Sequence, residues 1–163
     1  MRTEIDLVVN GRPVRVAVEP RNSLLHLLRA ELGLIGTKEG CGEGDCGTCV
    51  VLLNGKPVNS CLVLALECGG SEVTTIEGLA EFGKLEPLQE AFIKVGAVQC
   101  GFCTPGMILA AKALLDQVPD PSPDDIKRAL VGHLCRCTGY AKILEAVQLA
   151  ARMGRPEEVL IDG

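Results

Sequence analysis

The sequence has few aromatic residues: no tryptophan, one tyrosine and three phenylalanines occur among its 163 residues. Aromatic side chains usually supply much of the buried area of a small core, so the core of this chain must be thin and mainly aliphatic. The chain is nevertheless 47% hydrophobic with a mean hydropathy of +0.28, which excludes a disordered protein. Such a chain needs a further source of stability, such as a metal, a disulfide or a partner surface.

Long apolar runs are also missing. No run approaches the length of a bilayer span, so we expect no transmembrane segment. The N-terminal segment lacks the apolar centre of a secretion signal, which predicts a cytoplasmic protein. The 21 acidic residues outnumber the 16 basic ones, and the resulting net charge of −5 argues against a nucleic-acid partner.

The first half of the chain predicts a small sheet with one helix. Alternating apolar residues over 5–9 and 14–18 flank Asn10-Gly11, which is the pattern of a β-hairpin. Ser23 can cap a helix that runs to about Leu32. Further strands are expected over residues 50–53, 58–66 and 73–76. One helix over a small mixed sheet is typical of a β-grasp domain.

The second half predicts helices. Two candidates cover residues 86–95 and 104–117, and two more begin near Ser122 and at Thr138-Gly139. The hydrophobic period changes from that of strands to that of helices near residues 77–85, which indicates a domain boundary. We therefore expect an α+β chain with a β-grasp domain over 1–78, an all-α four-helix domain over 79–155 and a tail over 156–163.

Cysteine is abundant, with nine residues, and the cytoplasm disfavours disulfides, so metal binding is expected. One group has the spacing C-x4-C-x2-C followed by a fourth cysteine: Cys41, Cys46, Cys49 and Cys61. Plant-type [2Fe–2S] ferredoxins use this spacing. We expect the backbone at Gly42, Gly44 and Gly47 to bring N–H groups to the cluster sulfurs. Structural zinc is the alternative, although zinc-binding cysteines usually come as two C-x2-C pairs.

The second group comprises a C-x2-C pair and a C-x-C pair: Cys100, Cys103, Cys135 and Cys137. Each pair leads into an expected helix, at Thr104-Pro105 and at Thr138-Gly139. Both helix N-termini would then point at one site, where their free N–H groups favour an anion. A second [2Fe–2S] cluster fits this arrangement, and zinc stays open as the alternative from the spacing alone.

Four segments together resemble a known family. They are GTKEGCGEGDCGTC at 36–49, NSC at 59–61, QCGFCTPGM at 99–107 and LCRCTGYAKI at 134–143. In this order they are similar to the small iron–sulfur subunit of the molybdenum hydroxylases, the group of xanthine dehydrogenase, aldehyde oxidase and carbon monoxide dehydrogenase. The resemblance covers roughly residues 3–152 and favours [2Fe–2S] over zinc at the second group.

The resemblance implies a plant-type ferredoxin-like β-grasp domain followed by a helical [2Fe–2S]-binding domain. It also implies an oxidoreductase complex with a molybdopterin-binding large subunit and an FAD-binding medium subunit, often as a dimer of heterotrimers. Electrons would pass from the molybdenum cofactor through the second cluster and then the first to FAD. This chain would carry electrons and have no substrate site of its own. A freestanding two-cluster ferredoxin is the alternative.

Three further residues stand apart from these eight cysteines. The resemblance implies a contact between Gln99 and molybdopterin, and the alternative is an ordinary polar residue at a helix end. Cys68, the ninth cysteine, is expected to be a small buried apolar residue. His133 stands where the family more often has asparagine. Because the cysteines already provide four ligands, we expect His133 near the cluster or at the surface rather than on iron.

Overall fold

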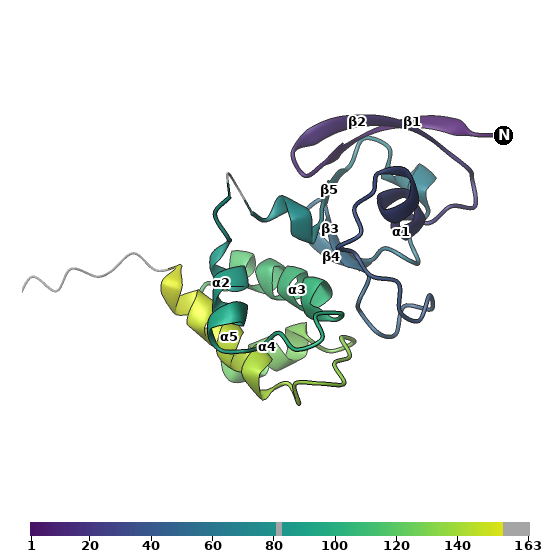
Figure 1. Ribbon diagram of the computed structural model, residues 1–163. Coiled ribbons are helices and arrows are strands. Elements are labelled where there is room, and N and C mark those ends of the chain that lie inside the picture. The colour runs from purple at the N-terminus through teal and green to yellow at the C-terminus, as the bar shows by residue number, and fades with distance from the viewer. Residues whose placement is uncertain (81–82, 155–163) are drawn as a thin grey trace, which may run out of the picture.

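The computed structural model describes residues 1–80 and 83–154, and the expected tail over 156–163 lies outside them. The chain is an α+β protein in which a mixed sheet precedes a group of helices (Figure 1). The strand order is β2-β1-β5-β3-β4, with β1 and β5 parallel and the other neighbours antiparallel. The strands are β1 (Thr3–Val9), β2 (Arg12–Val18), β3 (Val50–Leu53), β4 (Lys56–Asn59) and β5 (Glu72–Thr74).

Two Asn-Gly turns connect the hairpins of this sheet. The φ angles are 51° and 73° at Asn10 and Gly11, and 50° and 76° at Asn54 and Gly55. Positive φ at both turn residues matches the twist of the flanking strands, which confirms the hairpin predicted at Asn10-Gly11. The Asn10 side chain also accepts from the Thr75 backbone N–H at 2.8 Å, and this bond holds the end of β5 beside β1.

One helical segment covers the sheet. Ser23 caps α1 (Leu24–His26) by accepting from the His26 N–H at 3.2 Å, and a π-helical segment, η1 (Leu27–Glu31), continues it. The helix is therefore present where the sequence predicts it, but its geometry is irregular. Its buried leucines pack with the inner residues of the sheet, and the two form one core: Ile5, Leu7, Val9, Val18, Leu24, Leu27, Leu28, Val51, Ala65, Cys68 and Val73.

The strand predicted over residues 58–66 is wrong beyond Asn59. There the Leu62 N–H bonds the Asn59 carbonyl at 2.9 Å and the chain turns. Ser60 is fully buried, and its hydroxyl donates to the Cys49 carbonyl at 2.6 Å. Cys61 consequently lies in a turn beside the cysteine loop. The apolar residues after it form a 3-10 helix, η2 (Ala65–Cys68), and a second one, η3 (Ile76–Gly78), follows β5.

Four helices form the second half: α2 (Pro87–Lys94), α3 (Thr104–Gln117), α4 (Pro123–Ala129) and α5 (Ala141–Met153). Reciprocal side-chain caps begin two of them, Glu86 with Gln89 before α2 and Ser122 with Asp125 before α4. The first three helices begin where the sequence predicts. None of the helices in the described ranges is long and apolar enough to span a bilayer.

The predicted start of the last helix at Thr138-Gly139 is wrong. Tyr140 has a left-handed backbone with φ 66°, and the regular turns of α5 begin only at Ala141. The N-terminus of this helix is therefore displaced along the chain from Cys137. Only α3 begins directly at a cysteine, since Cys103 is its N-cap residue.

The two halves meet where α3 lies against β3. Leu109 and Ala113 of α3 are buried together with Val50 and Leu52 of β3. One turn earlier, a Cβ on Gly106 would overlap the backbone carbonyl of Gly47, so the helix backbone touches the loop that carries the first cysteines. Figure 1 shows this helix next to β3 and β4. The packing therefore brings the two cysteine-bearing regions to the same junction.

Candidate metal centres

The first group of cysteines lies in the loop before β3 and in the turn after β4. The sulfurs of Cys49 and Cys61 are 3.4 Å apart. Cys41 and Cys46 form the other close pair, because their side chains hydrogen bond and the Cys41 N–H donates to the Cys46 sulfur at 3.4 Å. The turn at Cys61, which sequence reasoning mistook for a strand, is what brings the distant fourth thiol to the loop.

The loop backbone turns its N–H groups toward sulfur. The amides of Glu43 and Asp45 both donate to the Cys41 sulfur at 3.4 Å. The bond from Glu43, then the backbone and side chain of Cys46, and then the bond from Asp45 lower the pKa of Cys41 to about 6, which favours the thiolate needed for metal binding. The predicted loop glycines Gly42, Gly44 and Gly47 all have positive φ, between 70° and 86°. Such turns are difficult for residues with a Cβ.

The second group is also arranged in two pairs. The thiols of Cys100 and Cys137 hydrogen bond to each other, as do those of Cys103 and Cys135. Burial, followed by the neighbouring Cys135, raises the pKa of Cys103 to about 12. Burial also disfavours the Cys135 thiolate, but bonds from Thr138 outweigh it and bring the pKa of Cys135 to about 7.

Thr138 supplies the donors that the sequence assigned to a helix N-terminus. Its backbone N–H lies 3.4 Å from the Cys135 sulfur and its hydroxyl lies 3.0 Å from the same atom. The expectation that two helix N-termini point at this site is therefore wrong, because α5 begins later. A turn at Thr138 takes the place of the second helix end, and α3 begins at Cys103.

The pairing of the thiols distinguishes between a zinc ion and a [2Fe–2S] cluster as the bound metal. A single zinc ion needs all four sulfurs at about 2.3 Å from one point. Among residues 1–80 and 83–154, no three histidine, cysteine, aspartate or glutamate side chains converge in this way. A [2Fe–2S] cluster instead takes two thiolates on each of two irons, and the two thiol pairs of each group match that requirement. Both groups therefore fit a [2Fe–2S] cluster better than zinc.

A direct bond joins the two cysteine regions. The backbone N–H of Leu134 donates to the carbonyl oxygen of Cys46 at 2.9 Å. Beside this bond, the His133 ring lies so close to Gly47 that a Cβ there would overlap the ring. The aromatic edge of Phe102 lies 3.8 Å from the position of a Cβ on Gly40. One residue of the first group is thus linked to the residue before Cys135 by a single hydrogen bond.

Cys68 is buried, as expected, and His133 lies beside a cysteine loop. The His133 ring contacts the first cysteine loop, its ring nitrogens are buried without a partner in the described residues, and burial lowers its pKa. Cys68 is fully buried in the core under α1, where burial raises the pKa of its thiol. Gln99 lies exposed next to Cys100.

Tyr140, the only tyrosine of the chain, is a site residue that the sequence patterns did not predict. Its hydroxyl accepts from the Cys135 N–H at 2.9 Å and donates to the His133 carbonyl at 3.1 Å. The position of Tyr140 within CTGY, directly after a cysteine pair, was the available signal. The spacing could not show that its ring folds back over the preceding cysteines.

Both candidate centres reach the surface. Cys41, Cys100 and Cys137 are exposed. Large apolar side chains within two residues of these groups' cysteines are exposed as well: Leu62, Val98, Phe102 and Leu134. Exposed apolar side chains gathered around candidate redox centres indicate surfaces that a partner covers.

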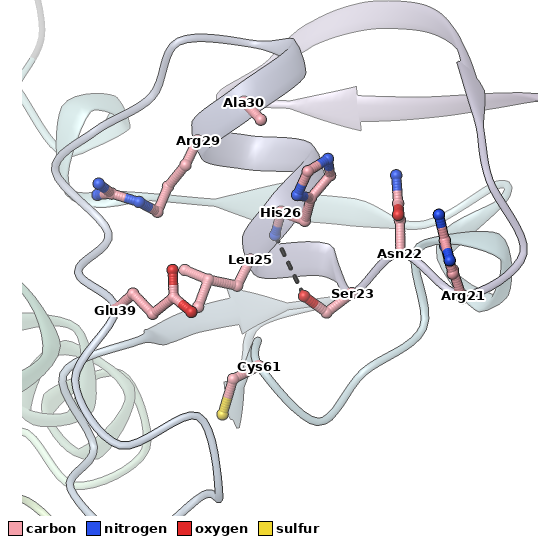
Figure 2. A pocket seen from close by; sticks show the side chains of 9 residues that line it. All are labelled: Arg21, Asn22, Ser23, Leu25, His26, Arg29, Ala30, Glu39 and Cys61. Atoms are coloured by element: carbon pink, nitrogen blue, oxygen red, sulfur yellow. Dashed lines mark hydrogen bonds between the residues drawn. The ribbon is translucent and has the colours of Figure 1, made fainter.

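A hollow of about 630 Å³ lies beside Cys61 (Figure 2). Its lining comes from the start of α1, from η1 and from the cysteine loop: Arg21, Asn22, Ser23, Leu25, His26, Arg29, Ala30, Glu39 and Cys61. Arg29 donates to two carbonyls of the loop over residues 35–37, which fixes it at the wall of the hollow. Arg21 at this hollow is ion-paired with Glu19 at 3.1 Å, so Glu19 and Glu39 balance the charges of Arg21 and Arg29 there.

Comparison with known proteins matches both halves of the chain to iron–sulfur families. The "2Fe-2S iron-sulfur cluster binding domain" matches residues 7–75, and the "[2Fe-2S] binding domain" matches residues 75–148. The two matches together cover both groups of cysteines. The chain therefore contains two [2Fe–2S]-binding domains.

Individual relatives agree with this. The chain is 53% identical to the "Nicotinate dehydrogenase small FeS subunit" of Eubacterium barkeri, covering 90% of this chain and 93% of the relative. It is 47% identical to the "Xanthine dehydrogenase iron-sulfur-binding subunit" of Escherichia coli O157:H7, covering 88% and 91%. Among solved structures, a chain of quinoline 2-oxidoreductase from Pseudomonas putida 86 matches with a TM-score of 0.90 and 43% identity, covering 95% and 99%.

Proposed function

Because the chain belongs to the iron–sulfur subunits of the molybdenum hydroxylase family, we propose that it carries electrons inside a molybdenum–flavin dehydrogenase. Electrons leave the molybdenum cofactor on a large subunit, cross the two [2Fe–2S] centres of this chain and reach FAD on a medium subunit. The observation that carries this proposal is the arrangement of eight thiols as two pairs in each half, with one hydrogen bond between the halves.

We assign one cluster to each group of cysteines. Cys41, Cys46, Cys49 and Cys61 hold the first, and Cys100, Cys103, Cys135 and Cys137 hold the second. When bound, a [2Fe–2S] cluster takes up and releases one electron at a time. The chain supplies thiolates, and it supplies N–H and hydroxyl donors that stabilise the negative charge on sulfur. These donors are the amides of Glu43 and Asp45 at the first cluster and Thr138 at the second.

The two clusters are expected to face different partners. We place the molybdopterin-binding subunit over the exposed Cys100 and Cys137, where Gln99 is free to contact the pterin and Phe102 offers apolar surface. We place the FAD-binding subunit beside the first group, where Cys41 and Leu62 are exposed. A dimer of such heterotrimers is the expected assembly.

We also divide the chain into two domains, one for each cluster. We propose a β-grasp domain over residues 1–78 and a four-helix domain over 79–155, which agrees with the sheet ending at Thr74 and with α2 beginning at Pro87. We also propose a cytoplasmic location, because a reducing compartment favours cysteines that bind metal over cysteines that form disulfides.

Affinity purification of the tagged full chain from its native host tests the proposal. The expected product contains iron, acid-labile sulfide, molybdenum and flavin together, because the two larger subunits accompany the chain. A chain that isolates alone with iron and sulfide is the freestanding two-cluster ferredoxin and contradicts the subunit proposal. A product with zinc in place of iron contradicts both.

A further inference from the structure

Tyr140 has a backbone conformation that needs an explanation. In the described residues, the non-glycine residues with positive φ are Asn10, Asn54 and Tyr140. The two asparagines belong to hairpin turns, where positive φ is usual. An aromatic residue has no such preference, and its left-handed backbone is strained. Strain of this kind persists only where the surroundings hold it, and it often marks a functional position.

The strained backbone delivers the Tyr140 hydroxyl to the segment before it. The hydroxyl accepts from the N–H of Cys135 and donates to the carbonyl of His133, at 2.9 and 3.1 Å. The ring packs against the core of the helical half, and the Tyr140 N–H bonds the Thr138 hydroxyl at 3.2 Å. One hydroxyl thus fixes the peptide groups on both sides of a single residue.

That single residue is Leu134. Its side chain is 60% exposed, so packing does little to orient it. Its N–H nevertheless points across the junction and donates to the carbonyl of Cys46 at 2.9 Å. Since Cys46 belongs to the first group and Cys135 to the second, this bond connects an assigned ligand of the first group to the residue before an assigned ligand of the second.

We infer that Tyr140 is a positioning residue for electron transfer between the two centres. Its hydroxyl clamps His133 and Cys135 so that the intervening Leu134 N–H keeps its bond to the Cys46 carbonyl. The inference deepens the proposed function and rests on it. A ring that merely anchors the start of α5 would need no hydroxyl, because the ring packing alone would provide the anchor.

The test compares Tyr140→Phe with wild type in the full chain loaded with its clusters. This variant keeps the packed ring and removes only the hydroxyl. Hydrogen exchange at the Leu134 amide is expected to become about tenfold faster, as loss of buried hydrogen bonds at this position predicts. In the complete complex, electron transfer between the two clusters is expected to slow, while the iron content stays that of wild type.

Two control variants make the result specific. Ser122→Ala removes a capping hydroxyl at α4 and is expected to leave the exchange of the Leu134 amide unchanged. Leu134→Ala keeps the backbone N–H and is expected to retain the slow exchange of that amide. Unchanged Leu134 exchange and an unchanged intercluster rate in Tyr140→Phe overturn the inference. Failure of the proposed function would instead appear as missing iron in the wild-type chain itself.

Discussion

Gly106 offers a sharp test of how closely the two halves of the chain meet. It lies in the first turns of α3, where a Cβ would overlap the Gly47 carbonyl oxygen and lie 3.4 Å from the Cα of Thr48. The obstacle is backbone of the cysteine loop, not the end of a flexible side chain. A methyl group at this position must therefore push the helix and the loop apart.

Two opposing effects set the size of the change in Gly106→Ala. Alanine favours the helix over glycine by about 1 kcal/mol. Overpacking a tight contact costs ~1–3 kcal/mol, and the rigid partner here favours the upper part of that range. The net loss is about 1–2 kcal/mol, which for a chain of this length lowers the thermal midpoint by roughly 2–8 °C.

The assay is thermal unfolding of the cluster-loaded chain, followed by far-UV circular dichroism and by visible absorption of the clusters. Gly154→Ala is the matched control, because Gly154 has φ −78° and a Cβ there would lie at an ordinary contact distance of 3.6 Å from the Ala150 carbonyl oxygen. That variant should unfold like wild type. If Gly106→Ala is as stable as wild type or more so, the close approach of α3 to the loop is refuted.

Four further substitutions test other parts of the account. Cys46→Ser and Cys103→Ser should each remove one cluster and so halve the iron per chain. Each should also lower the helix or sheet content of the half that loses its cluster, because a cluster stabilises a thin core. Full secondary structure without the cluster would contradict that role. Thr138→Val removes the hydroxyl beside the Cys135 sulfur and should lower the potential of the second cluster by about 60 mV in a redox titration. That shift corresponds to ~1.4 kcal/mol of preferential stabilisation of the reduced state for a one-electron couple. An unchanged or raised potential would argue against this donor. Ser122→Ala should lower the free energy of unfolding by about 1 kcal/mol in urea, with unchanged iron content, since it removes the cap of α4.

The features predicted correctly from the sequence depend on neighbouring residues. The hairpin at Asn10-Gly11 forms because two adjacent residues accept positive φ. The start of α4 follows from Ser122 and Asp125, which lie within one turn of each other. The spacing of the cysteines predicted two groups, and the structure places Cys41 beside Cys46 and Cys49 beside Cys61 in the first of them.

The wrong predictions come from hydrogen bonds that local sequence patterns do not indicate. An apolar run predicted a strand through Cys61, but the buried Ser60 bonds the Cys49 carbonyl and the chain turns there. A Thr-Gly pair predicted a helix start, but Tyr140 adopts a left-handed backbone and bonds back to Cys135. Periodicity and capping patterns do not report such contacts.

The contacts between the two cysteine regions also could not be predicted from the sequence. Gly106 and Gly47 are far apart in the chain, and nothing in either local pattern indicates that their backbones touch. The bond from Leu134 to Cys46 joins two backbone groups, so no side-chain type marks it. These contacts follow from how α3 packs on β3, which only the folded arrangement determines.

Electron paramagnetic resonance of the dithionite-reduced, cluster-loaded chain tests the central claim most directly. The account predicts two distinct [2Fe–2S] signals, one of which disappears in Cys49→Ser and the other in Cys135→Ser. A single signal, or the loss of both signals in either variant, would contradict the assignment of one cluster to each group of four cysteines.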